Sequence, residues 1–207
     1  MQAFNTPELD QSGTQILHPG SRALFRYWES IRAERACPQR KDLDLREITR
    51  IVPDLFILEK NRIKSIWDYR LAGTRVCGLF HQELTGKDAL AGWGHFERDV
   101  ISRSLSITHE RLQPSLVRMR LIMQTNQIIA AEMIGLPIMA TTNGPVQIIG
   151  GVFPFLNPKD DGHGVLARRE LVSARMIWTE HEQGDALLGA AGSLTQPQLR
   201  VIQGGLK

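Results

Sequence analysis

The sequence predicts an α+β fold, a five-stranded antiparallel sheet with helices on one face, preceded by N-terminal helices. Two compact apolar runs, 55–60 and 66–72, flank a short polar link and predict a β-hairpin. Three more strand-like runs follow at 115–123, 127–140 and 145–156. Because strands and helices come in blocks instead of alternating, a doubly wound parallel sheet is not expected.

Composition restricts the class of protein. The chain has 207 residues, of which 42% are hydrophobic and 23% charged, as in one soluble domain or at most two small ones. With 18 Gly, 10 Pro and 2 Cys, it fits neither a disordered or collagen-like chain nor a disulfide scaffold. No run approaches the ~18 apolar residues of a membrane span, and no secretory signal is recognised. Cys37 and Cys77 suit a reducing compartment, so a cytoplasmic location is predicted.

Charge gives weaker information. The net charge is +3, and segment 22–50 holds eight basic and five acidic residues. Alternating signs at helical spacing are typical of a solvated helix face, whereas nucleic-acid binders concentrate positive charge on one surface. Nucleic-acid binding through the basic N-terminal helices is therefore kept only as an alternative, and no membrane contact is expected.

The chain divides into three predicted parts. Residues 1–20 read as a flexible arm, 21–156 as one domain with an N-terminal helical extension, and 157–207 as a C-terminal helix with a mobile tail. The C-terminal helix is predicted over 166–178, and the Asp-Asp-Gly-His-Gly string at 160–164 is interpreted as a simple turn.

The first helix is predicted over Arg22–Arg35, with Ser21 as its N-cap and Pro38 beyond its end. Its apolar stripe recurs at helical spacing and consists of Leu24, Tyr27, Trp28 and Ile31. We expect this stripe to lie outside the sheet core and to pack against a second copy. The predicted state is therefore a homodimer through Arg22–Arg35.

Shorter helices are predicted between the strands. One follows Asp44 as its cap and ends at Pro53. A second begins behind Thr74, which follows a strand-ending Gly73 and is expected to act as the cap. A longer helix is predicted over 96–107.

Four strings carry a family resemblance: LFRYWESIR at 24–32, PQR at 38–40, YRLAGTRVC at 69–77 and ELTG at 83–86. They resemble those of a little-characterised family of small, standalone proteobacterial PAS-domain proteins, over about residues 22–156. The resemblance implies a curved PAS-like sheet whose helices enclose a pocket for a small molecule or cofactor. It implies sensing or signalling through a protein partner, without a fused output domain and without catalysis. It names no cofactor.

Seven ligand-binding residues are expected under this interpretation. Phe56, Tyr69, Leu71 and Phe153 would line the pocket, and Arg75, His81 and Trp93 would lie at its mouth. Arg75 gains nothing from the dipole of the helix that it begins, so it needs an anionic partner. A salt bridge to Glu59, Glu83 or Glu132 is favoured over a ligand anion.

Other chemistry is weaker in the sequence. Cys77 and His81 lie four residues apart, on one face of a short helix, and leave a small hydrolase or isomerase as an alternative. His95 and His109 flank the central helix, where a haem ligand could stand, but capping or surface roles are favoured. Glu132 lies in an apolar strand, so its face is wet or it pairs with Arg or a ligand, and surface placement is favoured. No metal site is predicted.

Overall fold

The computed structural model describes residues 16–61, 66–155 and 165–177, which form six antiparallel strands in the order β2-β1-β5-β4-β3-β6. The strands are β1 Leu55–Asn61, β2 Ile66–Ala72, β3 Ser115–Met123, β4 Ile128–Met139, β5 Val146–Pro154 and β6 Leu166–Met176. The helices are α1 Pro19–Arg32, α2 Thr74–Leu79 and α3 His95–Arg111, with 3-10 turns η1 Arg40–Asp42 and η2 Val52–Asp54. The predicted α+β antiparallel class is confirmed, with a sixth strand added beside β3.

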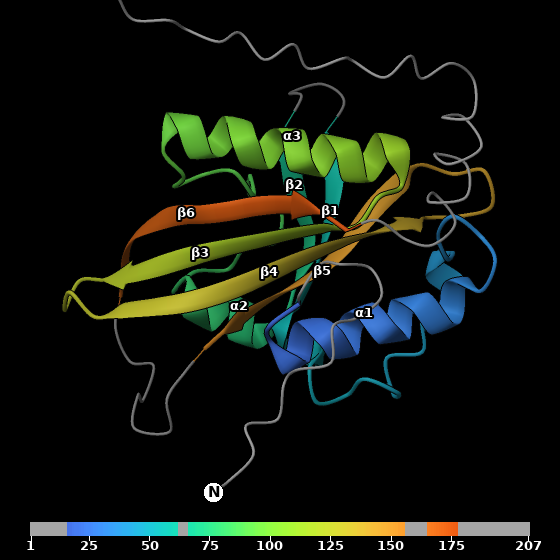
Figure 1. Ribbon diagram of the computed structural model, residues 1–207, viewed down its shortest axis with the longest axis horizontal. Helices are drawn as coiled ribbons and strands as arrows, with labels where there is room; N and C mark the ends of the chain where they lie inside the picture. The colour runs from blue at the N-terminus through green and yellow to red at the C-terminus, as the bar shows by residue number, and fades with distance from the viewer. Residues whose placement is uncertain (1–15, 62–65, 156–164, 178–207) are drawn as a thin grey trace, which may run out of the picture.

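Helices cover both faces of the sheet, instead of the single face predicted. α3 runs along one face and α1 along the other (Figure 1), and we name these the α3 face and the α1 face. In β1, Phe56 and Leu58 join the core on the α3 face, while Leu55 and Ile57 join the core on the α1 face. All four are buried, because alternate residues of a strand point to opposite sides.

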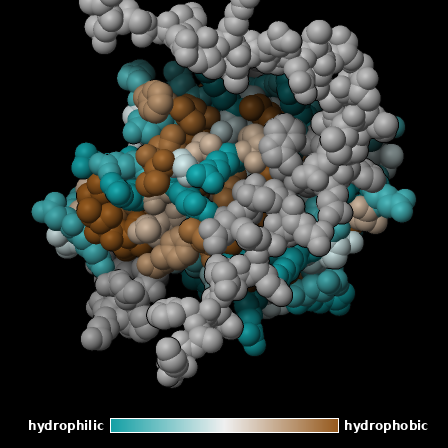
Figure 2. All heavy atoms as spheres, in the orientation of Figure 1, coloured by the Kyte–Doolittle hydropathy of each residue, from teal (hydrophilic) through white to brown (hydrophobic). Residues whose placement is uncertain are grey.

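α1 covers only part of its face of the sheet. It packs on β4 and β5, and Figure 2 shows apolar side chains at the surface over the strands that it leaves open, interrupted by polar ones. Ile128 of β4 is 60% exposed, and Val172 of β6 is 55% exposed. None of the exposed large apolar side chains among the described residues belongs to α1.

The start and the use of α1 differ from the prediction. The helix begins at Pro19, and His18 is its N-cap, with Nδ1 accepting a hydrogen bond from the Gly20 amide at 3.0 Å. Ser21, the predicted cap, is a buried residue inside the helix. The predicted stripe is buried within the chain: Trp28 is 1% exposed and donates from Nε1 to the Pro137 carbonyl at 2.8 Å. The expectation that this stripe lies outside the sheet core is therefore wrong. Homodimerisation remains a prediction, but the stripe no longer supplies its interface.

Glu132 of β4 ties the segment before α1 to the sheet. Its side chain is fully buried on the α1 face, so the favoured surface placement is wrong. Its carboxylate accepts hydrogen bonds from the Leu17 amide at 3.1 Å and the His18 amide at 2.9 Å, and it pairs with Arg118 at 3.3 Å. A buried carboxylate is tolerated because these donors replace water.

Two predicted short-helix features also need correction. The segment after Asp44 is a series of tight turns with bonds such as Ile51 N to Ile48 O at 3.0 Å, not an α-helix. Pro53 ends the segment after only a few residues, and the hydrogen bonds of so short a helix do not compensate for the entropy lost on nucleation. α2 forms where predicted, but Gly73 is its N-cap and Thr74 its first residue.

The predicted C-terminal helix over 166–178 is wrong, since Leu166–Met176 is the strand β6. It pairs with β3 along its length, from Met123↔Leu166 to Ser115↔Met176. The register shifts at Val172, so apolar residues before and after this bulge do not follow one period of two. The sequence pattern of this segment therefore did not predict a strand, and the strand forms because it pairs with the free edge of β3. The predicted arm and tail lie largely outside the described residues.

We predict that Glu132→Ala lowers the free energy of unfolding by about 3 kcal/mol, because it removes the acceptor of two buried amides and the partner of Arg118. Glu170→Ala is the matched control: its pair with Arg168 lies on the same sheet, but Arg168 is 67% exposed. We expect that control to cost less than about 1 kcal/mol. Urea denaturation of both variants measures this, and equal losses would contradict the role given to Glu132.

A second prediction concerns the turn between β2 and α2. A Cβ on Gly73 would lie 2.3 Å from the Pro53 carbonyl oxygen, whereas one on Gly78 would meet nothing within 4 Å. Gly73→Ala should therefore destabilise the protein by about 1–3 kcal/mol, since backbone must move. Gly78→Ala, in α2, should be neutral or stabilise by up to about 1 kcal/mol. Thermal melting of the two variants compares them directly.

Candidate functional site

A small apolar pocket lies between the α3 face of the sheet and the helices and loop that cover it. We name it the core pocket. Its lining comprises Phe56, Leu58, Tyr69, Phe80, Ala89, Trp93, Ile101, Leu105, Met119, Met133, Val152 and Arg169. The free space is about 10 Å³, room for about one water. The pocket is thus nearly closed by its own side chains.

Strands β1 and β2 build its aromatic wall. Leu58 pairs across the hairpin with Tyr69, and Phe56 meets Tyr69 edge-to-face with ring centroids 5.8 Å apart. Burial raises the pKa of Tyr69 to about 12. The hydroxyl therefore stays protonated at neutral pH and can donate a hydrogen bond.

Arg169 of β6 brings the one charged side chain into this lining. Its guanidinium lies 4.8 Å from the Trp93 ring centroid and 5.0 Å from that of Phe80, and it donates to the Ala91 carbonyl. Burial lowers the pKa of Arg169 from its ordinary value. The aromatic faces partly compensate for lost hydration through cation–π contacts.

Three of the seven predicted ligand residues meet in the core pocket: Phe56, Tyr69 and Trp93. Leu71 does not, because the register of the hairpin shifts between Ile57↔Leu71 and Leu58↔Tyr69, with Arg70 as the extra residue. This bulge interrupts the alternation that placed Leu71 beside Tyr69, and Leu71 is 46% exposed. Phe153 lies on the α1 face, stacked on His18 at 5.2 Å.

The two other predicted residues lie outside the core pocket. Arg75 pairs with Asp54, its Nε 2.6 Å from Oδ1, and donates to the Arg50 carbonyl at 2.7 Å. The salt-bridge interpretation therefore applies, with a partner that the sequence argument did not name. His81 is exposed, and its backbone φ is +49°.

The alternative pair Cys77 and His81 does not share a helix face. α2 ends at Leu79, and the left-handed backbone of His81 breaks the spacing of four. Cys77 Sγ instead lies 3.8 Å from a carboxylate oxygen of Glu83.

Neither candidate haem histidine lines the core pocket. His95 is exposed at the start of α3, and His109, in its last turn, packs edge-on against Trp67 with centroids 5.6 Å apart. Within the described ranges, no three His, Cys, Asp or Glu side chains come together as a metal site. None of the helices described combines the length and hydropathy needed to cross a bilayer.

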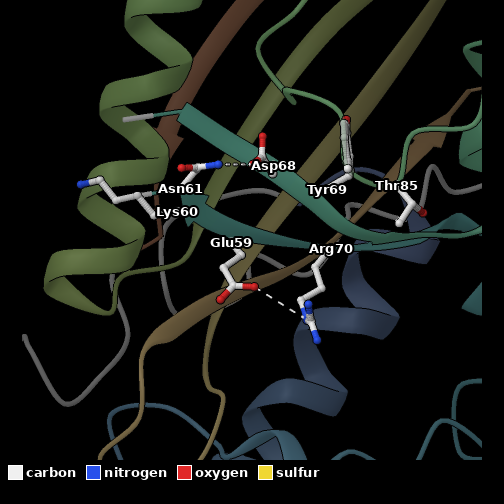
Figure 3. A pocket seen from close by; sticks show the side chains of 8 residues that line it. Glu59, Lys60, Asn61, Asp68, Tyr69, Arg70 and Thr85 are labelled. Carbon is white, nitrogen blue, oxygen red and sulfur yellow. Dashed lines mark hydrogen bonds and ion pairs between the residues drawn. The ribbon is translucent and has the colours of Figure 1, made fainter. Parts of the chain in front are cut away.

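A second hollow lies on the outside of the β1–β2 hairpin, with a volume of about 360 Å³ (Figure 3). It is polar, and its side chains satisfy one another: Asn61 donates to Asp68 at 2.8 Å, and Glu59 lies 3.7 Å from Arg70. Each of these pairs joins β1 to β2 (Figure 3). An open groove with its charges already paired has less capacity to select a ligand than the core pocket.

Sequence reasoning missed most of the core pocket's lining, above all Arg169. The apolar members, such as Leu58, Ile101 and Leu105, are ordinary core residues in sequence and carry no local signal. Arg169 fell in the segment predicted to be helical. Arg169 reaches the core pocket only because β6 pairs with β3, and no sequence motif predicts this pairing.

Comparisons with known proteins agree with this architecture. No curated protein matches the chain significantly. A family model described as a PAS domain matches residues 16–153, which include α1, the hairpin, α2, α3 and strands β3 to β5. β6 and Arg169 follow the matched region. The match spans more than half of the chain, and the chain therefore belongs to the PAS-domain family.

Proposed function

We propose that this PAS domain is a sensory module that binds a small, mainly apolar ligand in the core pocket and signals through a separate protein partner. The observation that carries this proposal is the lining itself, to which both sheet edges, α3 and the loop before α3 contribute. Such a lining can report a ligand to distant surfaces, because side chains of several elements must repack together. The described residues that line this pocket do not bring an acid, a base and a nucleophile together.

The core pocket can enlarge at two places. Met119 and Met133 are unbranched and adapt to irregular shapes with little loss of packing energy. Trp93 lies between Gly92, whose φ is +78°, and Gly94. These two glycines have no side chains to restrict the backbone on either side of Trp93. A ligand that displaces these groups would contact Tyr69, which lines the same pocket.

Several finer predictions belong with this proposal. They are homodimerisation, a cytoplasmic location and membership of the proteobacterial group of PAS-domain proteins. The buried stripe of α1 no longer supports the dimer interface. In segment 22–50, acids pair with the exposed basic residues Arg35 and Arg46, which supports a solvated surface over a nucleic-acid site.

Native mass spectrometry of the full chain, purified without added ligand, tests the pocket. We expect a discrete extra mass on the wild type that is lost in Ala89→Leu, where a larger side chain fills the pocket. Ala130→Leu adds the same atoms at an exposed position of β4 and should keep the extra mass. Circular dichroism checks that both variants fold, and Ala89→Val is the milder substitute if Ala89→Leu does not.

Two results would contradict the proposal. One is an extra mass that survives in a folded Ala89 variant. The other is a wild type without extra mass whose melting temperature no small-molecule fraction of a cell extract raises, since a bound ligand must stabilise the folded state.

A further inference from the structure

Arg169 is a partly buried cation without a counter-ion among the described residues. Of those residues, only Ala91 supplies a hydrogen-bond acceptor to its guanidinium, which has five N–H donors. The nearby acid Asp88 is already engaged, because it pairs with Arg98 at 2.7 Å. Among the described residues, no acidic side chain forms an ion pair with Arg169 within 4 Å.

The loop before α3 is shaped around this guanidinium. Ala91 turns its carbonyl to it, and Trp93 offers its ring. Between them, a Cβ on Gly92 would lie 2.5 Å from Arg169 Nη2, and the φ of +78° at Gly92 itself favours glycine. Three consecutive residues thus hold Arg169 at the rim of the core pocket without neutralising it.

Such an arrangement has an energetic cost unless an anion completes it. A charge withdrawn from water is costly until it is paired, and two aromatic faces return only about 1–2 kcal/mol. The planar fork of Arg matches a carboxylate through two parallel hydrogen bonds. Apolar side chains surround the rest of the lining, so they suit the body of the same ligand.

We propose that the ligand of the core pocket is a small organic acid whose carboxylate pairs with Arg169 and whose apolar body contacts Phe56, Tyr69 and Leu105. This inference rests on the proposed function, since it names the ligand class of the same pocket. It assigns selectivity to β6, a strand that follows the family match. Tyr69 lines the same pocket and supplies a hydroxyl close enough to Arg169 for the two groups to interact electrostatically.

The test compares two probes of equal size, 3-phenylpropanoate and 3-phenylpropanamide, titrated into the ¹⁵N-labelled full chain and followed by NMR. Wild type should bind the acid about ten-fold more tightly than the amide, as a hydrogen bond to a charged group predicts. Arg169→Gln should bring the ratio close to one. Arg168→Gln is the matched control, since Arg168 is 67% exposed and pairs with Glu170, and it should keep the wild-type ratio.

Several outcomes would overturn the proposal. Equal affinities of wild type for acid and amide would exclude an anion site while leaving the core pocket as a ligand site. A preference that survives in Arg169→Gln would place the anion elsewhere. Absence of binding of either probe at millimolar concentration would also overturn it, whereas a retained neutral ligand in the native mass spectrum would leave only the proposed function standing. If Arg169→Gln fails to fold, Arg169→Lys replaces it, and the acid-to-amide affinity ratio of that variant is compared with the ratio of the wild type.

Discussion

The central strands of this sheet are apolar on both sides, and this constraint determines where everything else lies. In β5, Ile148 and Val152 point to the α3 face, whereas Ile149 and Phe153 point to the α1 face, and all are buried. A sheet with two apolar faces needs two covering layers. α1 therefore cannot remain free for another molecule. Glu132 also follows from this constraint, because a carboxylate enclosed on the covered face must find donors, and the residues entering α1 supply them.

On the α3 face, the edge strand β6 determines how the sheet is covered. β6 extends the sheet beyond β3 and contacts α3, so the covering layer meets a wider surface than a five-stranded sheet would offer. An added edge strand also brings side chains that the smaller sheet lacks. Arg169 is one of them, and the loop at Gly92 accommodates it. The part of the chain outside the family match is therefore the part that gives the pocket its charge.

The sequence could predict what depends on local pattern. β2 and β3 have the predicted bounds, and β1 and α2 differ by a residue or little more, because turns or polar links punctuate them clearly. The predictions that were wrong concern features that depend on pairing with strands distant in the sequence. A bulge at Arg70 reverses the side of Leu71, and one at Val172 masks the period of β6, since register is set between strands. The residues of the core pocket divide on the same principle: Tyr69 lies in a string that carries the family resemblance, whereas the place of Arg169 depends on the pairing of β3 with β6.

A nearly closed pocket is consistent with a sensor. If the cavity were large and preformed, a ligand would enter without changing its surroundings, and the empty and occupied states would expose the same surface. With only about 10 Å³ free, the ligand that we propose would have to displace lining side chains, and this displacement would be the difference between states that a partner could recognise. Arg169 lies where this displacement would begin, between the ring of Trp93 on the loop and the backbone of an edge strand. Movement there would reach the surface of the protein directly, because the other edge of β6 faces no strand among the described residues.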